Sequence, residues 1–323
     1  MTNRLCVGTC GMSVWFSDDL GESWTRPYSE SGLYLEARVW ALSWHPGDPD
    51  TLHAGTDSGV YRWSNSAAGW THLPSPMDDV PIWSLVQAPH DPDLMFAGTQ
   101  PAALYRSRDR GRTWQLLDVA FPDECVFVHK PRVTQIVCDP FDAATVWAGV
   151  EIGGVWRSTD CGDNWQLCSD GLVSDDVHGL AVLDNGGRKL LATTNKGLHV
   201  STDDGLTWTH QPLDSPWQYT RAIQPGADGN GSLFLANGNG PPGSSGRLLH
   251  SSDAGAHWRD LGLPEPLNST PWCVAVNSAD SELLFVLTNL GQLFRSTDGG
   301  VRWIKLDREF GEVRAALWHP LST

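Results

Sequence analysis

The stretch Ser17–Trp24 reads SDDLGESW and is the first of six copies of the pattern S-x-D-x-G-x-x-W. The other five copies begin at Ser107, Ser158, Ser201, Ser251 and Ser296. A gap of double length after the first copy holds a degraded seventh, Ser64–Trp70, in which Ser66 replaces the Asp and one residue is missing. Seven units at about the spacing of one propeller blade indicate a repeat architecture.

Each copy lies between two short runs typical of β-strands, such as Val14-Trp15-Phe16 before the first motif. The motif is therefore predicted to be the turn of a β-hairpin. Its Asp can accept hydrogen bonds from the turn's own backbone, and its Gly supplies the positive φ that the turn needs. The Trp that begins the second strand covers the turn with a large apolar surface.

This pattern resembles the Asp-box, or BNR, repeat of sialidases, sortilin-type receptors and photosystem II assembly factors. The resemblance implies a β-propeller in which the box is a structural turn on the rim, remote from any active site. We therefore expect the box aspartates to be structural and not catalytic. Sialidases are typically six-bladed and carry an early Arg-Ile-Pro motif that this chain lacks, so only the logic of an anion-binding pocket carries over.

A second repeated phrase precedes the boxes, as in Trp40–Pro46 followed by Thr51–Thr56. One unit thus comprises four strands, A to D, and seven such units predict an all-β, seven-bladed propeller forming a single domain over residues 1–323. The chain begins with a B-like strand, Leu5–Thr9, and finishes with an unpartnered A-like strand, Arg314–Pro320. We expect this last strand to join the N-terminal strands B, C and D and close the ring.

Composition limits the partners. The 22 basic and 38 acidic residues give a formal charge of −16, which argues against nucleic acid and anionic membrane surfaces. No apolar run is long enough to span a membrane, and no secretory signal is expected at Met1–Leu5. Seven irregularly placed cysteines fit reduced thiols in a cytoplasmic protein, the alternative being a secreted form whose signal has been removed.

Metal ligands are sparse. Cys6 and Cys10 are too far apart along one strand for a compact site, and Cys161 and Cys168 are better interpreted as small core thiols. The repeated histidines, such as His45, fall in predicted A–B turns. We predict no metal site and no cofactor.

Aligning the seven A strands places one residue per blade at the mouth of the central channel. These residues are Trp40, Trp83, Thr134, His178, Arg221, Trp272 and Arg314. The positions two residues earlier include Arg38, Arg132, Asp176, Tyr219 and Glu312. Guanidinium groups hold carboxylates through paired hydrogen bonds, and indoles offer flat walls for a sugar or aromatic ring. The predicted substrate-binding set is therefore Arg38, Trp40, Trp83, Arg132, Arg221, Trp272 and Arg314. The alternative is that these arginines pair with Glu151, Asp176 and Glu312 as struts between blades.

Four residues at this mouth are candidate catalytic groups, namely Glu151, Asp176, His178 and Tyr219. Asp176 and His178 are two residues apart on one strand, so they share a face and the carboxylate can orient the imidazole. Glu151 precedes two glycines that allow close approach of a ligand to the backbone. Tyr219 shares a face with Arg221. A structural role remains open for each acid or base.

Two functions follow from this pattern. The first is an enzyme, a hydrolase or lyase, acting on a small anionic, carboxylate- or sugar-like substrate at the channel mouth. The second is a non-catalytic protein-interaction or assembly propeller, whose acidic surface favours a basic partner. Two long loops, residues 120–130 and 237–246, are expected on the ligand face, as surface decoration or as rim contacts.

Overall fold

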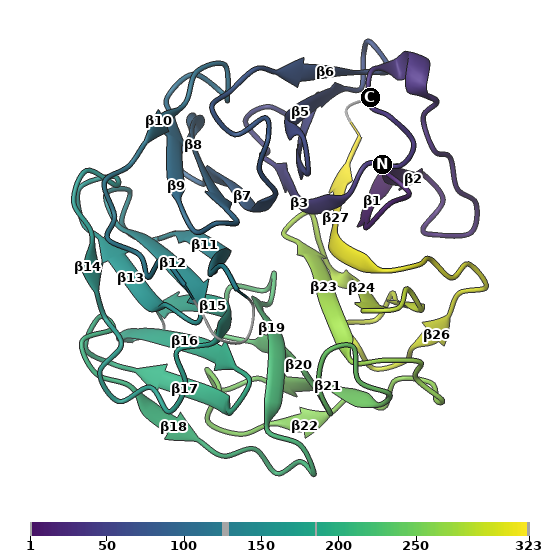
Figure 1. The fold of residues 1–323 in the computed structure, drawn as a ribbon. Coiled ribbons are helices and arrows are strands. Elements are labelled where there is room, and N and C mark those ends of the chain that lie inside the picture. The colour runs from purple at the N-terminus through teal and green to yellow at the C-terminus, as the bar shows by residue number, and fades with distance from the viewer. Residues whose placement is uncertain (1, 125–128, 185, 322–323) are drawn as a thin grey trace.

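A computed structural model describes residues 2–124, 129–184 and 186–321. Within these ranges the strands form seven antiparallel sheets arranged around one axis (Figure 1). The predicted all-β, seven-bladed propeller is confirmed.

Blade 1 combines both ends of the chain and contains β27 (Val313–Pro320), β1 (Asn3–Thr9) and β2 (Val14–Ser17). Blade 2 contains β3 (Val39–Trp44), β4 (Thr51–Thr56), β5 (Gly59–Ser64) and β6 (Gly69–Leu73). Blade 3 contains β7 (Ile82–Ala88), β8 (Asp91–Thr99), β9 (Leu104–Ser107) and β10 (Gln115–Leu116). Blade 4 contains β11 (Arg132–Cys138), β12 (Val146–Glu151), β13 (Gly154–Ser158) and β14 (Gln166–Leu167).

Blade 5 contains β15 (Val177–Asp184), β16 (Arg188–Thr194), β17 (Gly197–Ser201) and β18 (Thr209–Gln211). Blade 6 contains β19 (Tyr219–Pro225), β20 (Leu233–Gly238), β21 (Gly246–Ser251) and β22 (Arg259–Asp260). Blade 7 contains β23 (Pro271–Asn277), β24 (Asp280–Thr288), β25 (Leu293–Ser296) and β26 (Ile304–Lys305). A 3-10 turn, η1 (Ser29–Ser31), lies in the connection between blades 1 and 2.

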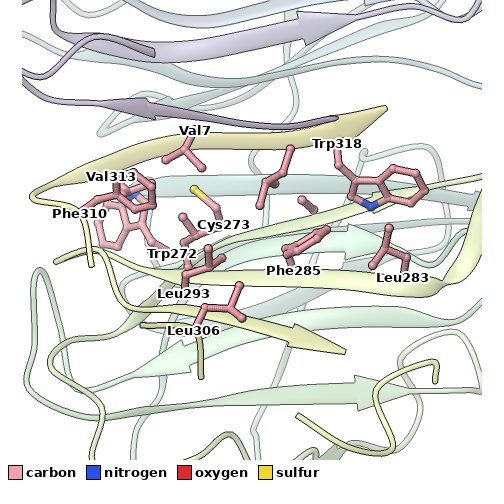
Figure 2. Close-up of a cluster of buried hydrophobic side chains, with 13 residues drawn as sticks. Val7, Trp272, Cys273, Leu283, Phe285, Leu293, Leu306, Phe310, Val313 and Trp318 are labelled. Atoms are coloured by element: carbon pink, nitrogen blue, oxygen red, sulfur yellow. The ribbon is translucent and has the colours of Figure 1, made fainter. Parts of the chain in front are cut away.

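The C-terminal strand closes the ring as predicted. Strand β27 pairs antiparallel with β1 from Asn3↔Pro320 to Thr9↔Val313. Behind this seam lies a cluster shared with blade 7, in which Trp318 is 1% exposed and lies at the same end as Leu283, with Val7 further along the same cluster (Figure 2). The first and last strands are therefore fixed by the same apolar core.

The box motifs form the expected turns. In the first copy the Asp19 carboxylate accepts hydrogen bonds from the Ser17 hydroxyl (2.8 Å) and the Ser23 backbone N–H (2.9 Å). The Trp24 indole donates to the Gly21 carbonyl at 3.0 Å. Gly21 has φ +92°, and a Cβ there would lie 2.5 Å from Leu306 Cδ1 of blade 7, so the turn also needs glycine for close blade packing.

The degraded box of blade 2 has a substitute carboxylate. Asp50, from the preceding A–B turn, accepts hydrogen bonds from the Ser64 hydroxyl (2.8 Å), the Ser66 hydroxyl (2.9 Å) and the Ser66 N–H (2.8 Å). The Ser64 hydroxyl is the equivalent of the Ser17 hydroxyl, while Ser66, at the position of the box Asp, donates in place of the residue four positions after that Asp. The carboxylate of Asp50 thus stands in for the missing box Asp, although it comes from a different part of the sequence.

Blade 1 differs from the prediction in its outer strand. The expected strand D is reduced to one bridge, in which Phe16 and Thr25 exchange both backbone hydrogen bonds at 2.8 Å. In blade 3 the third residue after the box Trp, Leu117, donates its N–H to Leu104. The equivalent residue in blade 1 is Pro27, which has no N–H to donate. Its sheet therefore has three strands.

Candidate functional site

A central channel of about 400 Å³ runs along the innermost strand of every blade. Its wall contains the seven residues that the strand alignment placed at one level: Trp40, Trp83, Thr134, His178, Arg221, Trp272 and Arg314. Among the described lining residues, Arg221 and Arg314 are the charged side chains apart from the titratable His178, and there is no Asp or Glu. A chain of formal charge −16 thus presents guanidinium groups to its own axis.

A β-bulge at the start of each innermost strand sets the direction of these side chains. In blade 2 the pairing passes from Val39↔Thr56 to Ala41↔Gly55, so Trp40 is the extra residue. Equivalent register shifts fall at the other six ring residues, as shown by the pairings of β7, β11, β15, β19, β23 and β27. A bulge re-aims a side chain that a regular strand would point into the blade.

Aromatic rings and guanidinium groups stack on one another across the mouth. Trp40 and Trp83 are parallel within 19°, with ring centroids 5.5 Å apart. The Arg132 guanidinium lies 3.9 Å from the Trp83 ring, and that of Arg221 lies 4.0 Å from Trp272. Arg314 is 4.9 Å from Trp272 and 5.6 Å from Trp83, so it reaches rings of two different blades. Such contacts between blades contribute about 0.5–2 kcal/mol each.

Two of these arginines have carboxylate partners within their own blade. Arg132 on β11 forms a bidentate pair with Glu151 on β12, with N···O distances of 2.5 and 2.6 Å. Arg314 pairs with Glu312 two residues earlier in the chain. The alternative of arginine–carboxylate struts between blades is wrong for these two arginines, because both carboxylates lie in the same blade as their arginine. Cation–π contacts connect the blades instead.

Arg221 differs from its neighbours because it forms no salt bridge with any described carboxylate. Burial lowers its pKa, and the positive charges of Arg314 and Arg132 lower it further, while Tyr219 and Glu151 act in the opposite direction. The mouth therefore holds one guanidinium whose charge is not matched by a direct partner.

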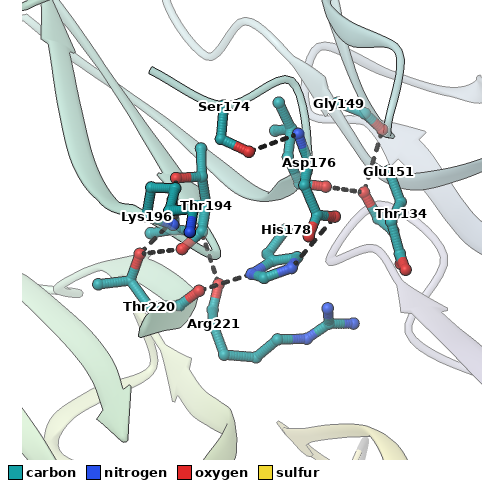
Figure 3. A network of polar contacts seen from close by, with 12 residues as sticks. Thr134, Gly149, Glu151, Ser174, Asp176, His178, Thr194, Lys196, Thr220 and Arg221 are labelled. Carbon is teal, nitrogen blue, oxygen red and sulfur yellow. Dashed lines mark hydrogen bonds and ion pairs between the residues drawn. The ribbon is translucent and has the colours of Figure 1, made fainter. Parts of the chain in front are cut away.

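Asp176 and His178 do meet as predicted (Figure 3). His178 Nε2 lies 3.4 Å from Asp176 Oδ1, and its Nδ1 lies 2.7 Å from the Thr220 carbonyl of blade 6. A carbonyl only accepts, so Nδ1 carries a hydrogen. A hydrogen bond between Nε2 and Asp176 then requires one further proton, held on the imidazole or on the carboxyl group.

Tyr219 lies beside this pair, with its ring centroid 5.0 Å from that of His178 and the two ring planes tilted by 49°. Burial raises the pKa of its phenol, although the adjacent Arg221 partly offsets the effect. A phenol with a raised pKa is a better hydrogen-bond donor than nucleophile near neutral pH.

Not all predicted residues come together. Arg38 is exposed and is absent from the channel wall. Three predicted residues contact wall residues without lining the channel themselves: Arg132 lies over Trp83, and Asp176 and Tyr219 lie beside His178. Glu151 is one step further from the wall, paired with Arg132. The wall also contains Gln87 and Gln224, which sequence reasoning missed. They follow the ring residues Trp83 and Arg221 by four and three positions, so extending the strand alignment would have found them.

The structure describes one of the two long loops in full and the other in part. Part of residues 120–130 lies outside the described residues. The loop 237–246 is held by the Asn239 side-chain carbonyl, which accepts from Ser244 N–H at 2.8 Å, and by the Thr270 hydroxyl, which donates to the Gly240 carbonyl at 2.7 Å. It is therefore tied to the first residues leading into blade 7.

Within the described ranges, no three His, Cys, Asp or Glu side chains are grouped so as to hold a metal ion. The absence of a metal and of a cofactor stays a prediction. No helix in the described part of the chain has the length and apolar character needed to cross a membrane.

No family model matches the chain. It is 28% identical to a xyloglucanase from Paenibacillus sp over 93% of this chain and 35% of that protein. It is 29% identical to the photosystem II assembly lipoprotein Ycf48 of Synechococcus sp. (strain CC9902), over 35% of this chain and 32% of that protein. The chain thus spans about a third of the length of these curated relatives.

Solved structures agree on the fold. The GH74 enzyme of Niastella koreensis superposes with a TM-score of 0.66 at 19% identity, covering 83% of this chain and 45% of that one. YCF48 bound to D1 peptide superposes with a TM-score of 0.56 at 14% identity, covering 83% and 82%. The class of protein that fold and channel define is a seven-bladed β-propeller related in sequence to xyloglucanases and to an assembly-factor propeller.

Proposed function

We propose that the protein binds a small, carboxylate-bearing, sugar-like molecule at the mouth of its central channel and acts on it as a hydrolase or lyase. The observation that carries this proposal is Arg221, a guanidinium in the channel wall that forms no salt bridge with any described carboxylate, whereas Arg314 beside it is paired with Glu312. An unpaired guanidinium facing a channel favours an anionic ligand. The similarity to xyloglucanases supports a sugar-like substrate and a hydrolytic reaction.

The residues around the mouth divide into binding and reacting groups. Arg221 holds the anionic group, and Trp40 and Trp83 supply flat faces for a ring. The pair of Asp176 and His178 exchanges one proton and serves as general acid or base. Glu151, fixed by Arg132, stabilises developing positive charge on the substrate.

The first test is a thermal-shift screen of uronic acids and uronate-containing oligosaccharides. We expect stabilisation of the wild type and its loss in Arg221→Ala and Arg132→Ala. The matched control is Arg308→Ala, because Arg308 also lies over an indole (4.3 Å from Trp15) but outside the channel. Equal responses in wild type and channel variants would contradict the binding proposal.

The second test measures turnover of any stabilising saccharide as release of new reducing ends or of an unsaturated product. Asp176→Asn should still bind but lose turnover by about 100-fold or more, the usual contribution of a general acid or base. Binding without turnover in the wild type would reject the enzymatic step and leave the binding site standing.

A non-catalytic partner-binding role is the second candidate, favoured by the similarity to Ycf48 and by the solved complex of YCF48 with a D1 peptide. The acidic surface fits a basic partner. A pull-down that recovers one stoichiometric partner equally with wild type and Arg221→Ala would favour this role.

We also propose a cytoplasmic location for the protein, and the six cysteines of the described residues are free thiols.

A further inference from the structure

The charges at the channel mouth also specify how many negative charges a ligand should carry. Resting on the proposed function, we infer that the site selects a monocarboxylate over a dianion, with Arg221 as the single open cation and Glu312 as the residue that excludes a second negative charge.

The first step is a count of paired and unpaired charges. Both Arg132 nitrogens that face Glu151 are used, at 2.5 and 2.6 Å. Arg314 is paired with Glu312. Arg221 has no salt bridge to a described carboxylate and lies 4.0 Å from the Trp272 ring centroid. One carboxylate can therefore pair with Arg221 without displacing a partner that the protein already holds.

The second step concerns a second negative charge. The acidic groups bordering the ring are Glu151, Asp176 and Glu312, and the first and last already occupy arginines. A second ligand carboxylate would have to displace Glu312 from Arg314 or lie near these like charges, and partly buried like charges repel strongly. A ligand with two carboxylates should therefore bind more weakly than a ligand with one.

The third step concerns the ligand's ring. Trp272 is 5% exposed and contacts both Arg221 and Arg314. Trp83 is covered by Arg132 on one side and stacks on Trp40. Trp40 is partly exposed, and within the described residues its one ring or cation contact is that with Trp83. Its other face is the flat surface on which an aromatic probe would stack.

The experiment is isothermal titration calorimetry with three probes that share a phenyl ring and differ in charge. Benzoate carries one charge, phthalate carries two, and benzamide is neutral. The wild type should bind benzoate about tenfold more tightly than either of the others, the effect of one charge-assisted hydrogen-bonded contact. Arg221→Gln should reduce benzoate to the affinity of benzamide, whereas Arg221→Lys should keep the preference. Arg308→Gln, outside the channel, should match the wild type.

The Glu312→Gln variant is the decisive test, because it should gain affinity for the dianion. It frees Arg314, so phthalate affinity should rise about tenfold relative to that of benzoate. Wild-type protein that binds phthalate as tightly as benzoate, or a Glu312→Gln variant with unchanged selectivity, overturns this inference but leaves an anion-binding channel in place. Wild-type protein that binds neither benzoate, phthalate nor any uronate overturns the proposed function itself, and the inference with it.

Discussion

The carboxylates of the box turns make the stability of the fold depend on pH. Hydrogen bonds from the Ser23 side chain and N–H lower the pKa of Asp19 to about 2, and the same arrangement lowers that of Asp160 to about 2. A carboxyl group whose pKa is lower in the folded state stabilises the fold above its ordinary pKa near 3.8. That stabilisation is lost as the pH falls towards 2.

We therefore expect the melting temperature to fall as the pH is lowered from 4 to 2, with protons taken up on unfolding. Asp19→Asn should show a shallower fall over this range, because one proton-linked group has been removed. The exposed Asp307→Asn serves as control and should follow the wild type. The measurement is scanning calorimetry at half-unit pH steps, and identical slopes for Asp19→Asn and the wild type would contradict the role of the box carboxylate.

Asp50 allows a second test at the scale of one residue. Its carboxylate accepts three hydrogen bonds from Ser64 and Ser66, as many as the Asp of the first box accepts from Ser17 and Ser23. Burial works to raise its pKa, but these bonds prevail and lower it. Asp50→Ala should lower the melting temperature by roughly 2–4 °C, since hydrogen bonds to charged groups are the stronger ones.

The matched control is Asp109→Ala, in which an ordinary box loses its own carboxylate. The two losses should be similar in size. An Asp50→Ala variant as stable as the wild type would mean that the degraded turn does not depend on this substitute.

At the scale of the element, the sequence predicted turns better than it predicted strand edges. The box at Ser17–Trp24 is visible because its chemistry is local, and the alignment of A strands placed Trp40 and Arg221 in one ring because their spacing repeats. The bulges at these same residues were not foreseen, since an extra residue is defined only against the paired strand. The shortened outer strand of blade 1 was missed, although Pro27 is the local signal for it.

The least predictable feature of the site was which side chains each arginine contacts. The residue types at the mouth were foreseen, but not that Arg132 would pair with Glu151 in its own blade while stacking on Trp83 of the preceding blade. Side chains as long as arginine reach several neighbours, and packing around the axis decides among them. The same uncertainty explains Arg38, which is aligned with Arg132 in sequence but lies exposed on the rim.

For the whole molecule, stability depends on closing the ring through β27. This strand supplies the inner position of blade 1 and the buried Trp318, which is 1% exposed in the cluster shared with blade 7. Truncation after Arg308 removes it, exposing the edge of β1 and the apolar faces of two blades. Because each blade packs only on its neighbours, an open ring can melt from its ends.

We expect the truncated chain to lose the single cooperative transition of the intact protein and to unfold over a broad temperature range. Trp318→Ala is the control for loss of core packing alone: it should cost about 3–5 kcal/mol but keep one sharp transition, because the β1–β27 hydrogen bonds remain. Adding a peptide of residues 309–323 to the truncated chain should restore part of the cooperativity. The measurement is calorimetric, comparing the heat of unfolding with the van't Hoff value. A truncated chain that melts in one sharp transition at the wild-type temperature would show that the other six blades hold together without the seam.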